Sequence, residues 1–120
     1  MALNPPRTDY KVNNTYHHPA ADTAATKTLT GDAGRVVVVD QILISYDITL
    51  GTKETLTIES PSGTTIFAVD LPAAAAATPW PPVLSIPFHK GLDGAVGEDV
   101  IITLSATAGG EIGKLNVLYH

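Results

Sequence analysis

The side chains that could bind a metal are few and scattered. His17 and His18 are adjacent, and neighbouring residues of an extended chain point to opposite sides, so the pair cannot easily hold one ion together. Their spacing matches no zinc-site pattern, and the chain contains no cysteine. We predict that both are polar surface residues beside Pro19 and that the protein uses no cofactor. A metal or a pH-sensitive contact is the alternative for this pair.

The hydroxyl and imidazole groups do not form a recognisable hydrolytic site. None of the serines lies in a Gly-x-Ser-x-Gly turn. Ser60 and Ser62 flank Pro61 in a predicted turn, where hydroxyls usually bond to the local backbone. His89 is predicted to be a polar residue at a strand end. We therefore predict that the protein is not an enzyme.

Carboxylates gather in the glycine-rich stretch 89–99, which contains Asp93, Glu98 and Asp99. Calcium requires six to eight oxygen ligands, and the spacing of an EF-hand loop is absent. The glycines also lack the order of a phosphate-binding loop. The stretch is predicted to be an acidic connection that keeps a strand edge soluble, with a weak calcium site as the alternative.

The net charge of the chain argues against some classes of binding partner. Twelve acidic and seven basic residues give a net charge of −5, which argues against binding to nucleic acid or to an anionic membrane. No apolar run approaches the roughly 20 residues of a membrane helix. The first 14 residues lack the apolar core of a secretory signal, so we expect synthesis in a cytosol.

The hydrophobic pattern from residue 26 onward has the period of β-strands. About seven short strands separated by glycine and proline turns are typical of sandwiches and barrels. The predicted strands are 26–30, 35–50, 54–60, 64–71, 83–88, 100–107 and 111–120. The proline- and alanine-rich stretch 72–82 is predicted to be a loop. The fold class is therefore all-β, a two-sheet antiparallel sandwich of jelly-roll type.

Alternation of apolar and polar residues within these strands identifies the core. The predicted core residues are Leu56, Ile58, Phe67, Val69, Ile102, Leu104, Leu115 and Val117.

Residues 1–25 have no strand or helix period and contain Pro5, Pro6 and Pro19. We predict an extended N-terminal arm that orders only against a partner, with residues 26–120 forming the sandwich body. Tyr10, Val12 and Tyr16 are separated by even numbers of residues, which places them on one side of an extended chain. They are predicted interaction residues.

The run Val36, Val37, Val38 and Val39 places two valines on each face of its predicted strand. A half-exposed strand would alternate, so both faces should be covered. Burial within the subunit and a contact with another subunit remain the two explanations. We predict that this run lies near a subunit interface.

The strand sequences also resemble a known group of proteins. The resemblance covers RVVVVDQILISYD (35–47) with its leading glycine, ETLTIESPSGTTIFAVDL (54–71) and the run 85–120, whose GEDVIITLSA and GKLNVLY carry most of the likeness. These segments resemble jelly-roll decoration (cement) and head-fibre-like virion proteins of tailed bacteriophages. The resemblance implies a structural protein on the outside of the capsid, which binds the major capsid protein and bridges subunits. It also implies a homo-oligomer, with a homotrimer preferred, that is assembled in the host cytoplasm.

A second class of function remains open. A carbohydrate-binding or receptor-binding module on a phage surface would require an exposed aromatic platform, for which Trp80 and Tyr119 are the candidates.

Overall fold

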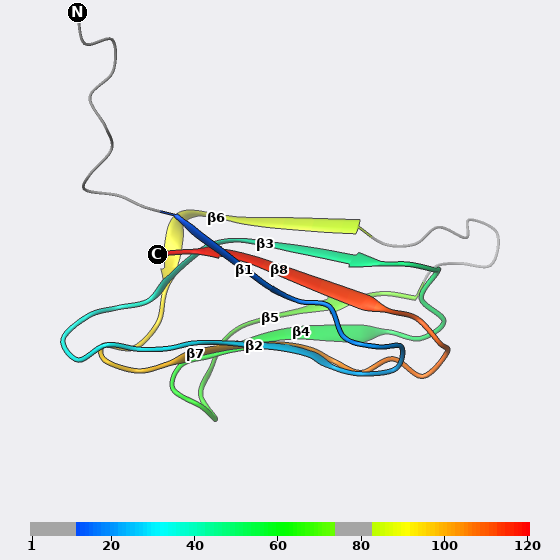
Figure 1. Ribbon diagram of the computed structural model, residues 1–120, viewed down its shortest axis with the longest axis horizontal. Helices are drawn as coiled ribbons and strands as arrows, with labels where there is room; N and C mark the ends of the chain where they lie inside the picture. The colour runs from blue at the N-terminus through cyan, green and yellow to red at the C-terminus, as the bar shows by residue number, and fades with distance from the viewer. Residues whose placement is uncertain (1–11, 74–82) are drawn as a thin grey trace, which may run out of the picture.

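The computed structural model describes residues 12–73 and 83–120, and these form eight strands and no helix (Figure 1). In chain order the strands are β1 (Asn13–His17), β2 (Ala25–Leu29), β3 (Val38–Tyr46), β4 (Glu54–Glu59), β5 (Thr65–Leu71), β6 (Val83–Asp93), β7 (Val100–Leu104) and β8 (Gly113–Tyr119). The prediction of an all-β chain is confirmed.

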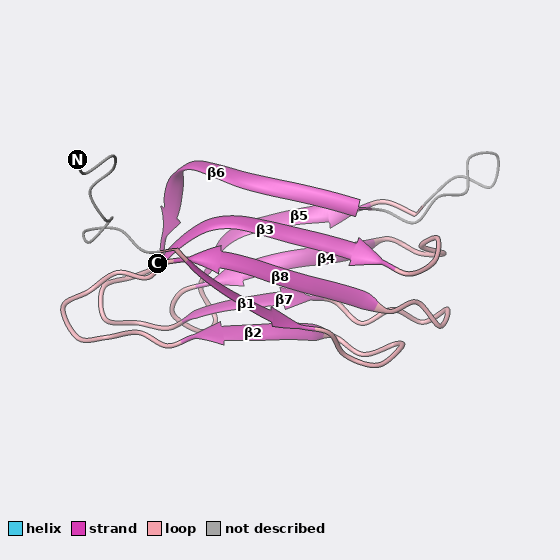
Figure 2. Cartoon of the chain, turned by 45° about the horizontal axis from the view of Figure 1, so that its top comes forward, coloured by secondary structure: helices cyan, strands magenta, loops and turns pink. Residues whose placement is uncertain are grey.

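The strands form two antiparallel four-stranded sheets that pack face to face (Figure 2). Sheet A has the order β1-β8-β3-β6, and sheet B has the order β2-β7-β4-β5. Strands that are distant in the sequence, such as β1 and β8, lie side by side, while most consecutive strands lie in different sheets. This arrangement is that of an eight-stranded jelly roll, as the sequence predicted.

The core lies between the sheets and follows the predicted alternation. Six of the eight predicted core residues are at most 1% exposed, namely Leu56, Ile58, Ile102, Leu104, Leu115 and Val117. Phe67 and Val69 are half-buried because they belong to β5, an edge strand of sheet B. Phe67 meets Phe88 of β6 edge to face, with ring centroids 5.1 Å apart. This pair packs between the edge strands β5 and β6 of the two sheets.

Strand β1 lies inside the region that the sequence assigned to the N-terminal arm. It pairs with β8 from Asn13 opposite Tyr119 to His17 opposite Leu115, so the prediction that the strands begin only at residue 26 is wrong. The sequence NNTYH contains one large apolar side chain, and hydrophobic periodicity cannot detect such a strand. Residues 1–11 and 74–82, with Tyr10 and Trp80, lie outside the described residues.

Strand β6 is longer than predicted because it continues through the start of the glycine-rich stretch. It bends sharply near its end, where residues 88–91 face only Asp40 of β3 (Figure 1). Gly91 has φ +79° at this bend, and a Cβ atom there would collide with the Cγ1 atom of Val38. Only glycine combines this backbone angle with so close an approach of β3. The bend leads the chain toward the end of the sandwich where β8 finishes.

Candidate interaction surfaces

One end of the sandwich is built from three connections, two of which are joined by a buried hydroxyl. Ser60, in the turn between β4 and β5, is 2% exposed. Its Oγ atom accepts a hydrogen bond from the Ala95 amide and donates one to the Asp99 carbonyl, both at 2.8 Å. The sequence predicted local backbone bonding for this hydroxyl. It instead joins the β4–β5 turn to the connection between β6 and β7, 35 and 39 residues away.

The β2–β3 connection is fixed to the same β6–β7 connection. The Gly31 amide donates to Oδ1 of Asp99 at 2.8 Å, so this carboxylate has a structural partner. Two backbone hydrogen bonds join the same two connections. The Gly97 amide donates to the Arg35 carbonyl at 2.7 Å, and the Gly94 amide donates to the Val37 carbonyl at 2.8 Å. The β2–β3 connection therefore has a defined position at this end.

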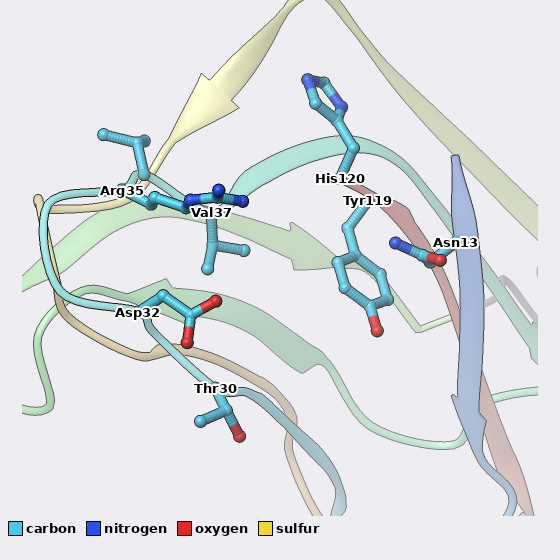
Figure 3. Close-up of a pocket in the computed structure, with 8 residues that line it drawn as sticks. Asn13, Thr30, Asp32, Arg35, Val37, Tyr119 and His120 are labelled. Atoms are coloured by element: carbon cyan, nitrogen blue, oxygen red, sulfur yellow. The ribbon is translucent and has the colours of Figure 1, made fainter. Parts of the chain in front are cut away.

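A cleft of about 510 Å³ opens between the β2–β3 connection and the neighbouring ends of β1 and β8 (Figure 3). The lining residues are Asn13, Thr30, Asp32, Arg35, Val36, Val37, Tyr119 and His120. We refer to this region as the cleft end of the molecule.

The chemistry of the cleft suits binding through mixed contacts. Figure 3 shows the Arg35 and Asp32 side chains on one side of the cleft and the Tyr119 ring with Asn13 on the other. Val37 adds an apolar surface between them. At the upper wall, Nδ1 of His120 lies 2.8 Å from Oδ2 of Asp40. The cleft thus places one cation, one anion, an amide and a phenol around an apolar surface.

The four predicted interaction valines have different surroundings. Strand β3 begins at Val38, so Val36 and Val37 precede it and line the cleft. Val39 is fully buried in the core, and Val38 is half-buried. The interpretation that all four lie within one strand covered on both faces is therefore wrong. Half of the run forms a cleft wall, and the other half begins a strand.

The predicted arm residues that can be described are exposed. Val12 is 43% exposed beside the start of β1, and Tyr16 is 60% exposed on the outer side of that strand. The Tyr16 ring lies against His18, with centroids 4.6 Å apart. His18 Nε2 is 3.3 Å from Oδ1 of Asn116, whereas Nδ1 of His17 accepts a bond from the Thr26 amide at 3.0 Å. The two histidines therefore bond to partners in different sheets, which agrees with adjacent residues of a strand pointing to opposite sides.

The outer face of sheet A is nearly free of formal charge from the row of Gln41 to the end of β3, whereas Asp40 and Asp93 lie beyond that row. Because opposite residues of antiparallel strands share a face, the register defines this surface in rows that run from β1 to β6. The rows are Asn14-Leu118-Gln41-Pro87, Tyr16-Asn116-Leu43-Ser85 and Lys114-Ser45-Val83. We call these residues the neutral face. Lys114 is its one charged member, and Tyr16, Leu43 and Val83 are its most exposed large apolar members.

Carboxylates hold the connections at the end opposite the cleft. Oδ1 of Asp22 accepts from the Gly110 amide at 2.8 Å. Oδ1 of Asp47 accepts from the Ile112 amide at 2.6 Å. Each side chain thereby attaches one connection to the β7–β8 connection. These two acids serve as acceptors for main-chain amides.

Two further carboxylates are buried at the same end, and sequence reasoning missed both. Glu54 is 6% exposed, and its two oxygens accept from the Ser105 hydroxyl at 2.8 Å and the Thr52 hydroxyl at 3.1 Å. The alternation of the strand did mark Glu54 as facing inward, because it is separated from the core residues Leu56 and Ile58 by even numbers of residues. Glu111 is 2% exposed in the β7–β8 connection, where no periodic pattern marks it.

Tyr46 lies close to both buried carboxylates at the end of β3. Burial raises the pKa of its phenol, and the charges of Glu54 and Glu111 raise it further. The Tyr46 hydroxyl and Oε1 of Glu111 are buried without a hydrogen-bond partner, while Oε2 of Glu111 accepts from the Gly51 amide at 3.1 Å. This group is therefore the place in the described chain where buried polar atoms are left unsatisfied.

The described ranges contain no group of three or more His, Asp or Glu side chains placed to hold a metal ion. No helix that could cross a membrane occurs in them either.

Comparison with known proteins gives structural neighbours without a family. No family model matches the chain, and no curated protein matches it in sequence. Dimeric latent PorU from Porphyromonas gingivalis matches 93% of this chain over 13% of its own, with a TM-score of 0.51 and 11% identity. A structure of the infectious bursal disease virus Gt strain matches 98% of the chain over 35% of its own, with a TM-score of 0.39 and 16% identity. A mutant VP2 protein of that virus in T=1 particles matches 100% over 36%, with the same TM-score and identity.

These identities are low, and the chain spans about an eighth of the PorU chain and about a third of each viral chain. The similarity to PorU supports the fold alone. The chain is a member of the jelly-roll class of β-sandwiches.

Proposed function

We propose that this chain is a structural virion protein that decorates the outside of a tailed-phage head and stabilises it by bridging subunits. The observation that carries the proposal is the eight-stranded jelly-roll order of the two sheets. This architecture recurs in viral capsid domains, although it also occurs in lectins and cupins. The resemblance of segments 35–47, 54–71 and 85–120 to phage decoration proteins favours a viral capsid role.

The proposed partners are the major capsid protein and further copies of the chain. The chain would be assembled in the host cytoplasm and reside on the capsid surface. The proposal includes self-association, for which the resemblance favours a homotrimer. The protein is proposed to act without catalysis, because the buried carboxylates and Ser60 are used in holding connections and strands together.

The cleft end is the surface proposed to meet the shell. It gathers Val36 and Val37 of the predicted interaction residues, and Asn13 begins β1 at this end. Val12 and Val96, which are 43% and 65% exposed, add apolar surface near these residues. Val96 belongs to the β6–β7 connection that is bonded to Arg35 and Val37.

Binding to phage heads tests this proposal directly. Heads of the phage that encodes the chain, assembled without it, should co-sediment the added protein in a saturable manner. Val96→Asp should weaken binding about 10-fold or more, since one tenfold step corresponds to about 1.4 kcal/mol. Ile48→Asp is the matched control, because Ile48 is 47% exposed at the opposite end. Absence of the protein from both sedimented heads and purified virions would refute the proposal.

A carbohydrate-binding function is the second candidate, and Tyr16 is the observation in its favour. Of the two aromatic residues expected to form a platform, Trp80 lies outside the described residues and Tyr119 is half-buried at the cleft. Among the described aromatic residues, Tyr16 is the exposed one, with the amide of Asn116 opposite it on β8. Glycan-array binding that is lost in Tyr16→Ala would support this alternative.

A further inference from the structure

The neutral face differs from the rest of the surface in charge. The chain carries a net charge of −5, yet the three rows of the neutral face contain no carboxylate; the carboxylates of sheet A, Asp40 and Asp93, lie beyond the row of Gln41, toward the cleft end. Lys114 lies at one margin, in the row nearest the ends of β1 and β3. Amides, hydroxyls and apolar side chains make up the remainder. Depletion of charged residues together with an exposed tyrosine is the composition found at the centre of protein interfaces.

The other described surfaces carry acids. The outer face of sheet B contains Glu59 and Asp70. The connections at the cleft end contain Asp32 and Glu98, and those at the opposite end contain Asp22 and Asp47. Two copies of the same acidic chain would therefore bring like charges together if they met through any of these surfaces. Like charges placed opposite each other oppose association.

We propose that the neutral face is the surface through which two copies of this chain associate. This face lets two acidic copies approach without bringing carboxylates opposite each other. A contact between identical faces is isologous and pairs copies two at a time. The inference rests on the self-association contained in the proposed function and replaces its threefold arrangement with a twofold one.

Leu43 has the central position in this contact. It lies on β3 in the middle row, between Asn116 of β8 and Ser85 of β6, and is 38% exposed. Its neighbours across and along the strands are uncharged. In a twofold contact near the centre of the face, the two copies of Leu43 lie close together, so a charge placed there meets its own copy.

The size of the neutral face determines how strongly two copies are expected to associate. Four strands about 4.8 Å apart and about 20 Å long present a surface of roughly 400 Å². Stable complexes bury about 800 Å² on each partner. We therefore expect a weak pair, with a dissociation constant of about 0.1 mM. Such a pair becomes populated at high local concentration, as on a capsid surface.

Sedimentation velocity of the full chain, from about 10 to about 500 µM, tests the proposal around the expected dissociation constant. The wild type should convert reversibly from monomer to dimer. Leu43→Asp should weaken dimerisation about 10-fold or more because it places two carboxylates near the twofold axis. Thr57→Asp is the matched control, with the same charge change on the central strand β4 of sheet B, and should dimerise like the wild type.

A charge-exchange experiment distinguishes this contact from other ways of dimerising. Leu43→Lys should also dimerise poorly alone, but a mixture with Leu43→Asp should form a one-to-one heterodimer in native mass spectrometry. Raising the salt from about 0.05 to about 0.5 M should leave wild-type dimerisation unchanged or strengthen it, because screening reduces the repulsion between two acidic copies. If Leu43→Asp melts far below the wild type, Tyr16→Asp on the exposed edge strand takes its place.

Several outcomes would overturn the inference. These are a monomer at every concentration, a trimer, or a dimer that Leu43→Asp and Tyr16→Asp leave intact. A monomer that binds a glycan array through Tyr16 would assign the face to a carbohydrate instead. The head-binding assay is independent of these results, because the Val96→Asp and Ile48→Asp variants leave the neutral face unaltered.

Discussion

The outer faces of the two sheets share a strand geometry but differ in chemistry. On sheet A the middle row is Tyr16-Asn116-Leu43-Ser85, without a charge. On sheet B the corresponding row is Thr26-Thr103-Thr57-Ala68, and the carboxylates of Glu59 and Asp70 lie on either side of it. The inward residues of the central strands are mostly apolar in both sheets. The core therefore constrains the inner faces alike and leaves the outer faces free to differ.

The carboxylates on sheet B have local partners. Oε1 of Glu59 accepts from the Gly63 amide at 3.1 Å. Asp70 accepts from the Thr55 hydroxyl at 3.0 Å and lies 3.6 Å from the Lys53 ammonium group. Sheet B thus gives each of these surface carboxylates a hydrogen-bond partner within the subunit. The exposed groups of the neutral face include the apolar side chains of Tyr16, Leu43 and Val83, which have no such use in an isolated subunit.

The largest expected effect is the loss of β1 from sheet A. Deleting residues 2–20 removes this strand and uncovers β8, whose Leu115 and Val117 are fully buried. We expect the free energy of unfolding to fall by about 3 kcal/mol or more, out of the 5–15 kcal/mol typical of a domain. From the sequence alone this deletion should leave the body folded.

Circular dichroism melting of the deletion variant decides between the two expectations. Tyr16→Ala is its control, because that side chain lies on the outer face and its removal should change stability by no more than about 0.5 kcal/mol. An unchanged melting temperature in the deletion variant would mean that β1 is dispensable.

The next largest effects are expected from truncating one side chain at the centre of sheet B and one at its open edge. Ile102 is fully buried on the central strand β7, and Ile102→Ala should cost about 2–5 kcal/mol. The sequence placed Phe67 in the core as well, where Phe67→Ala would cost about 3–5 kcal/mol. Because Phe67 is half-buried on β5 and packs against Phe88, we expect a loss below that range. Urea unfolding that shows a greater loss for Phe67→Ala would reverse this ranking.

The alternation of apolar residues carried most of the fold prediction. Strands with a buried inner face, such as β4 and β7, show a period of two that the sequence displays directly. Strand β1 lacks that signal because its inward positions, Thr15 and His17, are polar residues at a sheet edge. Edge strands need little apolar surface, so periodicity underestimates them.

The candidate sites were less accessible to prediction because they depend on which loops meet. Val36 and Val37 were singled out, but Asn13 and Tyr119 join them through the pairing of β1 with β8. The neutral face depends on the register of four strands that are distant in the sequence. Its members are unremarkable one by one, and only the strand order places them together.

The smallest effect tests the buried seam between the two sheets, where Tyr46 of sheet A faces Glu54 of sheet B. Since burial and then the two carboxylates raise the pKa of Tyr46, the folded chain keeps this proton at a pH where the unfolded chain, with a pKa of about 10, releases it. The stability that Tyr46 contributes is thus complete below about pH 10 and is lost as the pH rises further, by about 1.4 kcal/mol per pH unit.

Tyr46→Phe should remove this alkaline loss. Near neutral pH the substitution removes a buried hydroxyl without a partner, so stability should change by no more than about 1 kcal/mol. Above about pH 10 the melting temperature of Tyr46→Phe should fall less steeply than that of the wild type. Tyr16→Phe, on the exposed neutral face, is the control and should follow the wild-type curve. Parallel curves for the wild type and Tyr46→Phe would show that the seam does not hold this proton.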